Sequence, residues 1–240
     1  LCSGNPEAQN AVAAAGAIPL LVAMLQSGKV QMPAAGALAK LAAGNEMVRA
    51  MIASADGLPP LLALLNGVNI PAQVQAAAAL AELTRGDAAT QVAVARAGGI
   101  RPLVAMLQSR NTHAQSYGAS ALAQVAANHR DNQDAIARVG GLVPIVNLLP
   151  SGNPPEVQAM ASLALAEVSR LNHDNQTNAV ELGVVSMLVL LLRSPYDSVR
   201  AEAAGAAWAL TQEHAENKRS VAGAGTVPLL VSLLANGSPR

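Results

Sequence analysis

The chain has 240 residues, of which 52% are hydrophobic and 12% charged, and its 15 basic and 15 acidic side chains cancel at neutral pH. This composition excludes intrinsic disorder, and a zero net charge supplies no long-range attraction to nucleic acid or to an anionic membrane. Cys2, the single cysteine, excludes a scaffold of internal disulfides and indicates a reducing compartment, so we expect a cytoplasmic or nuclear location.

A short apolar phrase recurs six times along the chain at a nearly constant step. In chain order the copies are GAIPLLVAML, DGLPPLLALL, GGIRPLVAML, GGLVPIVNLL, GVVSMLVLLL and GTVPLLVSLL, beginning at Gly16, Asp56, Gly98, Gly140, Gly183 and Gly225. Fifteen residues before each copy stands an aliphatic residue, in order Leu1, Leu41, Leu83, Val125, Val168 and Leu210. Two features in the same register indicate an internal repeat of about 42 residues.

Each repeat is predicted to contain three helices, because turn residues interrupt the helical spacing of its apolar residues twice. In the third repeat we expect these helices at 88–97, 100–108 and 114–127. The glycine that opens the phrase is expected to end the first helix in a left-handed turn. The second repeat has Asp56 there, and we expect Gly57 to take over this role. A proline in the first turn of the second helix sacrifices only an amide that would lack a partner.

The third helix of each repeat is the longest, and its aliphatic residue serves below as position 0. Positions −3, −4, −7 and −11 are almost all apolar or small; in the second repeat they are Leu80, Ala79, Ala76 and Ala72. This spacing predicts one buried stripe, in which the alanines let neighbouring helices approach closely. Positions −9, −5, −2 and +2 lie opposite the stripe and are predicted to face a groove.

The phrase G-x-[IVL]-P-x-L-[LV]-x-x-L, the 42-residue step and the A-L-A-x-L third helix resemble armadillo repeats over essentially the whole chain. The resemblance implies an all-α fold, a right-handed superhelical solenoid of three-helix armadillo repeats in a single domain, 1–240. We place the repeats at about 4–43, 44–85, 86–127, 128–170 and 171–212, with a partial repeat at 213–234. Two-helix HEAT repeats are the nearest alternative, but the short first helix closed by glycine favours armadillo repeats.

Neither end of the chain has the polar face of a capping repeat, and Leu1 is expected to be the tail of a preceding third helix. Terminal repeats of a solenoid need such a face to stay soluble. Two interpretations stay open: the chain is a segment of a longer array, or its ends associate with another copy.

The third helices of armadillo solenoids line a concave groove, and the resemblance therefore implies that partners bind there. Members of the family that bind extended peptides, such as nuclear-import adaptors and catenins, typically carry Trp at −2 and Asn at +2. Only Trp208 fits this pattern, with Gln212 in place of Asn; Trp208 packing on its own repeat is the alternative. At +2, Arg85 and Arg170 are either ligands for carboxylates or phosphates or solvated side chains near a helix end. The predicted partner-binding residues are Arg85, Ser116, Ser120, Leu163, Arg170, Trp208 and Gln212.

The sequence contains no complete motif for catalysis or metal binding. His129-Arg130-Asp131 imitates the kinase catalytic loop, but Ile136 stands where that loop needs Asn, so we expect a helix cap. His173 and His214 fall one repeat apart, too far for a shared zinc ion. We therefore predict no catalytic residue, no metal, no cofactor and no enzymatic activity. The longest charge-free apolar stretch, 182–192, is too short for the roughly 20 residues of a membrane helix.

The resemblance implies a non-catalytic scaffold or adaptor whose groove binds a segment of a partner protein. The alternative is a spacer or regulatory module of a larger protein, for example a ubiquitin ligase, with the groove filled intramolecularly. A nuclear-import adaptor is disfavoured, because a basic localisation signal needs acidic groove residues and +2 carries Arg85 and Arg170. Nucleic acid and membrane are not expected as partners, and self-association through the uncapped ends stays an alternative.

Overall fold

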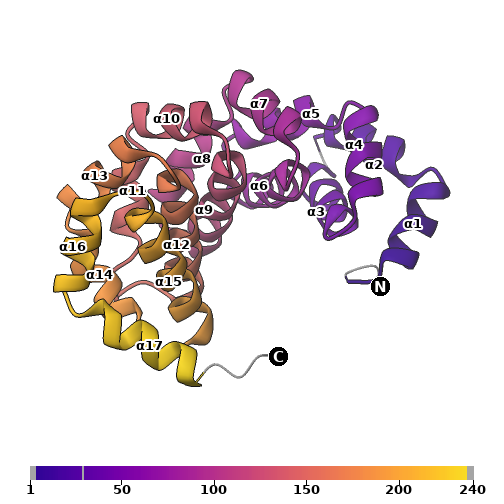
Figure 1. Cartoon of the computed structure of the whole chain (residues 1–240). Coiled ribbons are helices and arrows are strands. Elements are labelled where there is room, and N and C mark those ends of the chain that lie inside the picture. The colour runs from indigo at the N-terminus through magenta and orange to yellow at the C-terminus, as the bar shows by residue number, and fades with distance from the viewer. Residues whose placement is uncertain (1–3, 29, 237–240) are drawn as a thin grey trace. The chain divides into compact units, whose positions relative to one another are not determined.

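The computed structural model describes residues 4–28 and 30–236, and within these ranges the regular structure is entirely helical (Figure 1). Leu1 and Cys2, on which two of the predictions above depend, lie outside the described residues. The chain forms two compact units, Leu1–Val125 and Ala126–Arg240, which meet one residue before the end of a long helix. The predicted all-α fold is confirmed.

Helices of the first unit come in three groups of three. They are α1 (Pro6–Ala14), α2 (Ala17–Leu25), α3 (Gln31–Ala42), α4 (Glu46–Ser54), α5 (Leu58–Leu65), α6 (Ile70–Thr84), α7 (Ala88–Arg96), α8 (Ile100–Leu107) and α9 (Thr112–Ala126). The helices predicted for the third repeat agree with α7, α8 and α9 within two residues at each end.

In the second unit two further groups of three are followed by a pair. The helices are α10 (Arg130–Arg138), α11 (Leu142–Asn147), α12 (Pro155–Ser169), α13 (His173–Glu181), α14 (Val184–Leu191), α15 (Asp197–Thr211), α16 (Ala215–Gly223) and α17 (Thr226–Asn236). By sequence register α16 and α17 correspond to α13 and α14.

The core of each unit is built around the third helices, which pack on one another as well as on their own repeat. In the first unit α3 lies against α6, and in the second α12 lies against α15 (Figure 1). Leu38 and Leu80 are fully buried, and so are Ala35 and Ala77, whose small methyl side chains allow a close contact between helices. Each buried leucine contributes about 1.5–3 kcal/mol to stability, so packing holds these helices in place more than their own propensity does.

The turn between the first and second helices has the left-handed residue that the sequence predicts, with one difference. Gly16, Gly98, Gly140, Gly183 and Gly225 have φ between 78° and 81°. In the second repeat Asp56 itself takes the left-handed conformation at φ 59°, whereas Gly57 has φ −70°, so the prediction that Gly57 takes over is wrong. Gly57 is needed for packing, because a Cβ atom there would lie 2.6 Å from Cγ2 of Ile52.

A second left-handed residue follows each described third helix, two residues after the helix ends. After α3 and α6 this residue is Gly44 or Gly86, whereas after α9, α12 and α15 it is Asn128, Leu171 or Glu213, with φ between 53° and 56°. A side chain in this conformation costs roughly 1–2 kcal/mol, because its Cβ crowds the following carbonyl oxygen. Leu171 therefore holds strained backbone that the glycines avoid.

We expect Leu171→Gly to raise the free energy of unfolding by about 1 kcal/mol, the strain of a left-handed residue that carries a Cβ. The leucine side chain is half exposed, so its removal forfeits little packing. Urea unfolding followed by circular dichroism measures the difference, with Gly86→Ala as the reverse control that should destabilise. A lower midpoint for Leu171→Gly than for wild type would contradict this account.

A buried glutamine ties the first helix of a repeat to the end of its third helix. Nε2 of Gln133 on α10 donates to the carbonyls of Glu167 and Arg170 at 2.8 and 3.2 Å, and its Oε1 accepts from Nδ2 of Asn172 at 3.2 Å. Equivalent amide-to-carbonyl bonds are made by Gln9, Gln91 and Gln176. Since the last carbonyls of a helix lack partners within it, these glutamines act as caps.

No single helix among the described residues is long and apolar enough to cross a membrane. Two bent pairs, Pro6–Ala14 with Ala17–Leu25 and Glu46–Ser54 with Leu58–Leu65, reach that length and composition only when taken together, at bends of 80° and 87°.

Candidate functional site

The positions of the third helices that are exposed to solvent differ in part from those that the sequence predicts to face the groove. Position −2 is buried in Ala39, Ala81 and Ala166, so the prediction that this row faces a groove is wrong for these residues. On α3, α6, α9 and α12 positions −8, −5, −1 and +2 are exposed or part-exposed, whereas on α15 position −1 is the buried Ala209 and position −2 is the exposed Trp208. The reason is that α12 packs on α15, and α3 on α6, which buries a second flank of each helix besides the predicted stripe.

We call the exposed residues of α12 and α15 the third-helix face. It consists of Met160, Leu163, Glu167 and Arg170 on or just after α12, and of Glu202, Gly205, Trp208 and Gln212 on or just after α15. Sequence analysis predicted Leu163, Arg170, Trp208 and Gln212 for the site, and it missed Met160, Glu167 and Glu202. All of them belong to the second compact unit.

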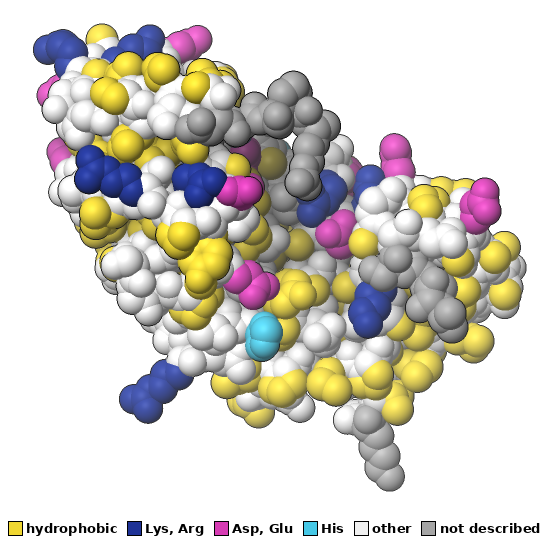
Figure 2. All heavy atoms as spheres, turned by 90° about the horizontal axis from the view of Figure 1, so that it is seen from below, with side chains coloured by type: hydrophobic (Ala, Val, Ile, Leu, Met, Phe, Trp, Pro, Cys, Tyr) yellow, Lys and Arg dark blue, Asp and Glu magenta, His cyan; other side chains and the backbone are white. Residues whose placement is uncertain are grey.

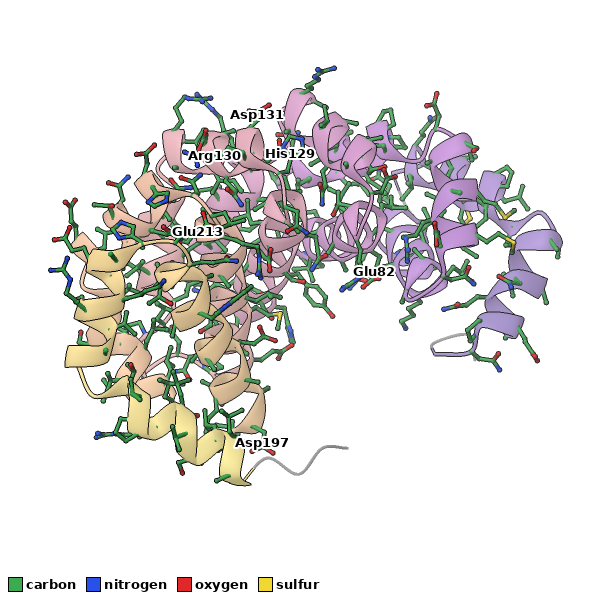
Figure 3. All side chains as sticks on the ribbon, viewed as in Figure 1. Glu82, His129, Arg130, Asp131, Asp197 and Glu213 are labelled. Atoms are coloured by element: carbon green, nitrogen blue, oxygen red, sulfur yellow. The ribbon has the colours of Figure 1, made fainter. Side chains whose placement is uncertain are left out.

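Both arginines at position +2 have an acidic partner on their own helix. Nε and Nη2 of Arg85 contact the two carboxylate oxygens of Glu82, the residue labelled in Figure 3, at 3.3 and 3.2 Å. Nε and Nη2 of Arg170 contact those of Glu167 at 3.1 and 2.5 Å. Each arginine is therefore already paired with a carboxylate through two hydrogen bonds, which makes it less available to an anionic ligand, and the Arg85 side chain stays about half exposed.

Trp208 is the exposed aromatic of the third-helix face. It is 53% exposed, and the guanidinium carbon of Arg170, from the preceding repeat, lies 4.8 Å from the centre of its ring. At that distance the cation interacts favourably with the aromatic face. The contact crosses from one repeat to the next, so the alternative that Trp208 packs on its own repeat does not describe it.

Glu202 brings a second carboxylate near that of Glu167. Partial burial raises its pKa above the ordinary value, and the nearby Glu167 carboxylate raises it further. Among the described residues no ion pair is formed by Glu202. Since Glu167 and Arg170 cancel, the charge left on this part of the face is negative. Figure 2 shows how acidic and basic side chains lie next to one another among hydrophobic ones on one face of the molecule.

The raised pKa of Glu202 gives a pH-dependent prediction. Its contribution to stability is fully present below the unfolded-state pKa, about 4.5, and is lost as the pH rises through the raised value. Glu202→Gln should therefore match wild type at pH 4 and be slightly more stable at pH 7. Urea midpoints at the two pH values test this, with the exposed Glu156→Gln as the control. An equal difference at both pH values would refute it.

The remaining predicted residues contribute less to a binding surface. Ser116 is 4% exposed, so its prediction as a groove residue is wrong, because position −9 is buried on α6, α9 and α12. Ser120 and Leu163 are part-exposed. Gln212 follows the end of α15, where its backbone carbonyl accepts from Nε2 of Gln176 at 3.0 Å. Its side-chain oxygen is buried without a hydrogen-bond partner.

The histidines serve the helix starts. His129 precedes α10, and its Nδ1 accepts from the backbone amide of Asn132 at 3.3 Å, as expected for a helix cap. Figure 3 shows His129, Arg130 and Asp131 together at the start of α10. His173 and His214 are closer than one repeat spacing suggested, with ring centres 5.2 Å apart. In the described part of the chain no three His, Cys, Asp or Glu residues gather as metal ligands would.

Comparison with known proteins identifies the family. A family model described as the Armadillo/beta-catenin-like repeat matches residues 45–85. A designed armadillo repeat protein superposes with a TM-score of 0.82 at 26% identity, over 93% of each chain. The chain belongs to the armadillo-repeat family. Its repeats thus have the fold that the resemblance implied, and the second predicted repeat, 44–85, contains the match.

Two further solved structures are similar to this armadillo chain. The crystal structure of an engineered protein shares 32% identity, with a TM-score of 0.83 over 92% of this chain and 90% of the other. A designed armadillo repeat protein in complex with the peptide (KR)4 shares 25% identity, with a TM-score of 0.79 over 92% and 93%. The search of curated proteins found no match.

Proposed function

We propose that this armadillo chain is a non-catalytic scaffold that binds an extended segment of a partner protein on its third-helix face. The observation that carries the proposal is the group formed by Glu167, Arg170, Glu202 and Trp208. It combines an exposed aromatic ring with a carboxylate, Glu202, that has no cationic partner among the described residues. The single cysteine leads us to propose a cytoplasmic or nuclear location as well.

The chemistry of this group favours a partner segment with a basic side chain. One basic side chain can meet the carboxylate of Glu202, and the stem of another along the same segment can lie against the exposed part of the Trp208 ring. Burial of that carboxylate has already displaced part of its water, so a cation that reaches it meets a stronger field than at an open surface. This differs from the sequence-based expectation of anionic ligands, because Glu167 neutralises Arg170.

The designed armadillo relative in complex with (KR)4 supports a basic segment of this kind. Binding of fluorescein-labelled (KR)4 to this chain, followed by anisotropy, tests the proposal, with an acidic peptide of equal length as the control ligand. We expect saturable binding of (KR)4 that Glu202→Gln weakens about tenfold, the loss of one charge-assisted hydrogen bond. Trp208→Ala should weaken it as well.

Glu156→Gln is the matched control variant, because it also removes one carboxylate charge. Glu156 is exposed in the first turn of α12, far along the helix from Glu167 at position −1. It should bind (KR)4 nearly as wild type does. If it weakens binding as much as Glu202→Gln, only net charge matters and the assigned site is wrong. If neither peptide binds, the third-helix face is not a peptide site.

A further inference from the structure

The connector between α14 and α15, residues 192–196, contains the one serine among the described residues that is followed by proline. This serine, Ser194, is part-exposed, and Pro195 and Tyr196 after it are exposed. A residue before proline favours extended backbone, and Tyr196 is extended as well, with φ −96° and ψ 122°. Protein kinases bind their substrate segments in extended form, and one class of them requires proline directly after the serine. The connector has the sequence and the exposure that this class needs.

The hydroxyl group of Ser194 is held as an acceptor and not as a donor. Its Oγ accepts from the backbone amide of Tyr196 at 3.3 Å. The backbone of Ser194 is bonded on both sides, since its amide donates to the carbonyl of Leu191 at 3.0 Å and its carbonyl accepts from Nη1 of Arg200 at 2.7 Å. The hydroxyl hydrogen has no acceptor in the part of the chain that the structure describes, so a phosphoryl acceptor at this oxygen breaks no bond that Ser194 donates.

Arg200 stands where the first four repeats have glutamine. The residue ten positions before the aliphatic residue of the third helix is Gln31, Gln73, Gln115, Gln158 and then Arg200. Three of these glutamines donate to a carbonyl at or just after the end of the second helix, at 2.8 to 3.1 Å, and Arg200 does the same through Nη1. A neutral amide is therefore enough for this bond. The guanidinium adds a positive charge and further N–H donors, of which Nη2 contacts Asp197.

We propose that Ser194 is a phosphorylation site for a proline-directed protein kinase, and that Arg200 binds the phosphate group. In the reaction Oγ of Ser194 attacks the γ-phosphorus of ATP and forms a new O–P bond. The bond from that phosphorus to the bridging oxygen breaks, its electron pair leaves with ADP, and the hydroxyl proton passes to the catalytic aspartate of the kinase.

Arg200 is already placed to receive the product. A serine phosphate carries close to two negative charges and three acceptor oxygens, and a guanidinium pairs with such a group through two parallel hydrogen bonds. Nη1 of Arg200 lies against the carbonyl of Ser194, and Nη2 is bonded only to the exposed carboxylate of Asp197. The arginine can exchange Asp197, whose side chain is 92% exposed, for the phosphate. The phosphate then joins the connector to the first turn of α15.

The connector between α8 and α9 provides a control within the same chain. Ser109 corresponds to Ser194 in repeat register, and its Oγ likewise accepts from a backbone amide two residues further on, that of Asn111, at 3.1 Å. Arg110 follows it in place of proline, and Gln115 bonds its carbonyl in place of arginine. The two serines thus have equivalent hydrogen bonds, and they differ in the two features on which the proposal depends.

The test uses the full chain with Ser238→Ala, because Ser238-Pro239 is the other Ser-Pro pair of the sequence. The chain is incubated with ATP and a purified mitogen-activated protein kinase, which is proline-directed, and peptide mass spectrometry identifies the modified residue. We expect phosphate on Ser194 and none on Ser109. Pro195→Ala should lower the rate of incorporation at least about tenfold. No incorporation at Ser194, or equal incorporation at Ser109, would overturn the proposal.

The role of Arg200 is measured by urea unfolding of the phosphorylated and unmodified chains, followed by circular dichroism. Arg200→Gln is the matched variant, because glutamine at this position bonds the connector carbonyl in the other repeats. Phosphorylation should raise the urea midpoint of the chain that has Arg200, and it should lower that of Arg200→Gln, in which the phosphate meets Asp197 without a cation between them. An equal change in both chains, or a lower midpoint with Arg200 present, would show that Arg200 does not bind the phosphate.

Discussion

Gln133→Leu is expected to lower the free energy of unfolding by about 3 kcal/mol, although leucine is of similar volume and the site is buried. The substitution removes the donor that satisfies the carbonyls of Glu167 and Arg170, and the acceptor that satisfies one N–H of Asn172. Leucine fills the space but leaves these groups buried without partners. Each such group costs about 1–3 kcal/mol, which outweighs the gain from the added apolar surface.

Urea unfolding followed by circular dichroism measures the loss, and Gln176→Leu is the matched comparison. Gln176 also donates to two carbonyls, but its Oε1 has no hydrogen-bond partner. The residue that corresponds to Asn172 in the next repeat is His214, whose side chain has no amide group to donate. Gln176→Leu should therefore cost less than Gln133→Leu. Equal losses would mean that the acceptor side of the bond contributes nothing, and no loss in either would refute the capping role.

The capping glutamine could have been found in the sequence, since Gln9, Gln91, Gln133 and Gln176 all stand seven residues before the left-handed glycine of their repeats. A search guided by apolar periodicity does not reveal it. A polar residue within a helix is usually predicted to face solvent. Gln133 is buried because it donates to a carbonyl at the end of another helix, 34 residues further along the chain, and the local sequence does not contain that information.

The helices themselves were predictable because local chemistry decides them. Glycine in the left-handed turn and proline in the first helical turn set the helix ends within two residues in the third repeat. The one error, at Asp56, has a local reason too, since aspartate tolerates the left-handed region better than most side chains. Gly57 was misassigned because its need for a hydrogen in place of Cβ depends on Ile52.

The candidate site was predictable only in part, because it depends on how repeats pack. The pairs of Glu82 with Arg85 and Glu167 with Arg170 are three residues apart on a helix, and that spacing alone predicts them. The contact of Arg170 with Trp208 joins residues 38 positions apart, and the register between two repeats sets it. Glu202 was missed because position −8 was assigned neither to the buried stripe nor to the groove.

The burial of position −2 in the first four repeats could have been inferred from its alanines. Position −2 holds Ala39, Ala81, Ala123 and Ala166 in successive repeats, and a row of alanine alone is typical of helices in close contact rather than of a binding groove. Trp208 interrupts the row in the fifth repeat. Trp208 is 53% exposed whereas Ala166 is 3% exposed, so the same position has opposite roles in α12 and in α15.

Ala166→Trp tests this difference, and it is expected to lower the free energy of unfolding by at least about 3 kcal/mol. Ala166 is 3% exposed on α12, which packs on α15, so an indole ring there would have to displace neighbouring atoms. Overpacking by a few methylene groups already costs about 1–3 kcal/mol, and an indole is larger. Trp208→Ala, the same exchange in reverse, should change stability by less than about 1 kcal/mol, because the ring is half exposed.

Urea unfolding of both variants, read by circular dichroism so that the tryptophan content does not matter, compares the two positions directly. A tryptophan at the groove surface would be tolerated equally at both, as the sequence-based assignment of position −2 requires. If Ala166→Trp unfolds at the urea concentration of wild type, position −2 of α12 faces solvent, and the third-helix face must be redrawn. If only Ala166→Trp is destabilised, helix-to-helix packing determines this row, and the half-exposed ring of Trp208 is the member of the row that a partner can reach.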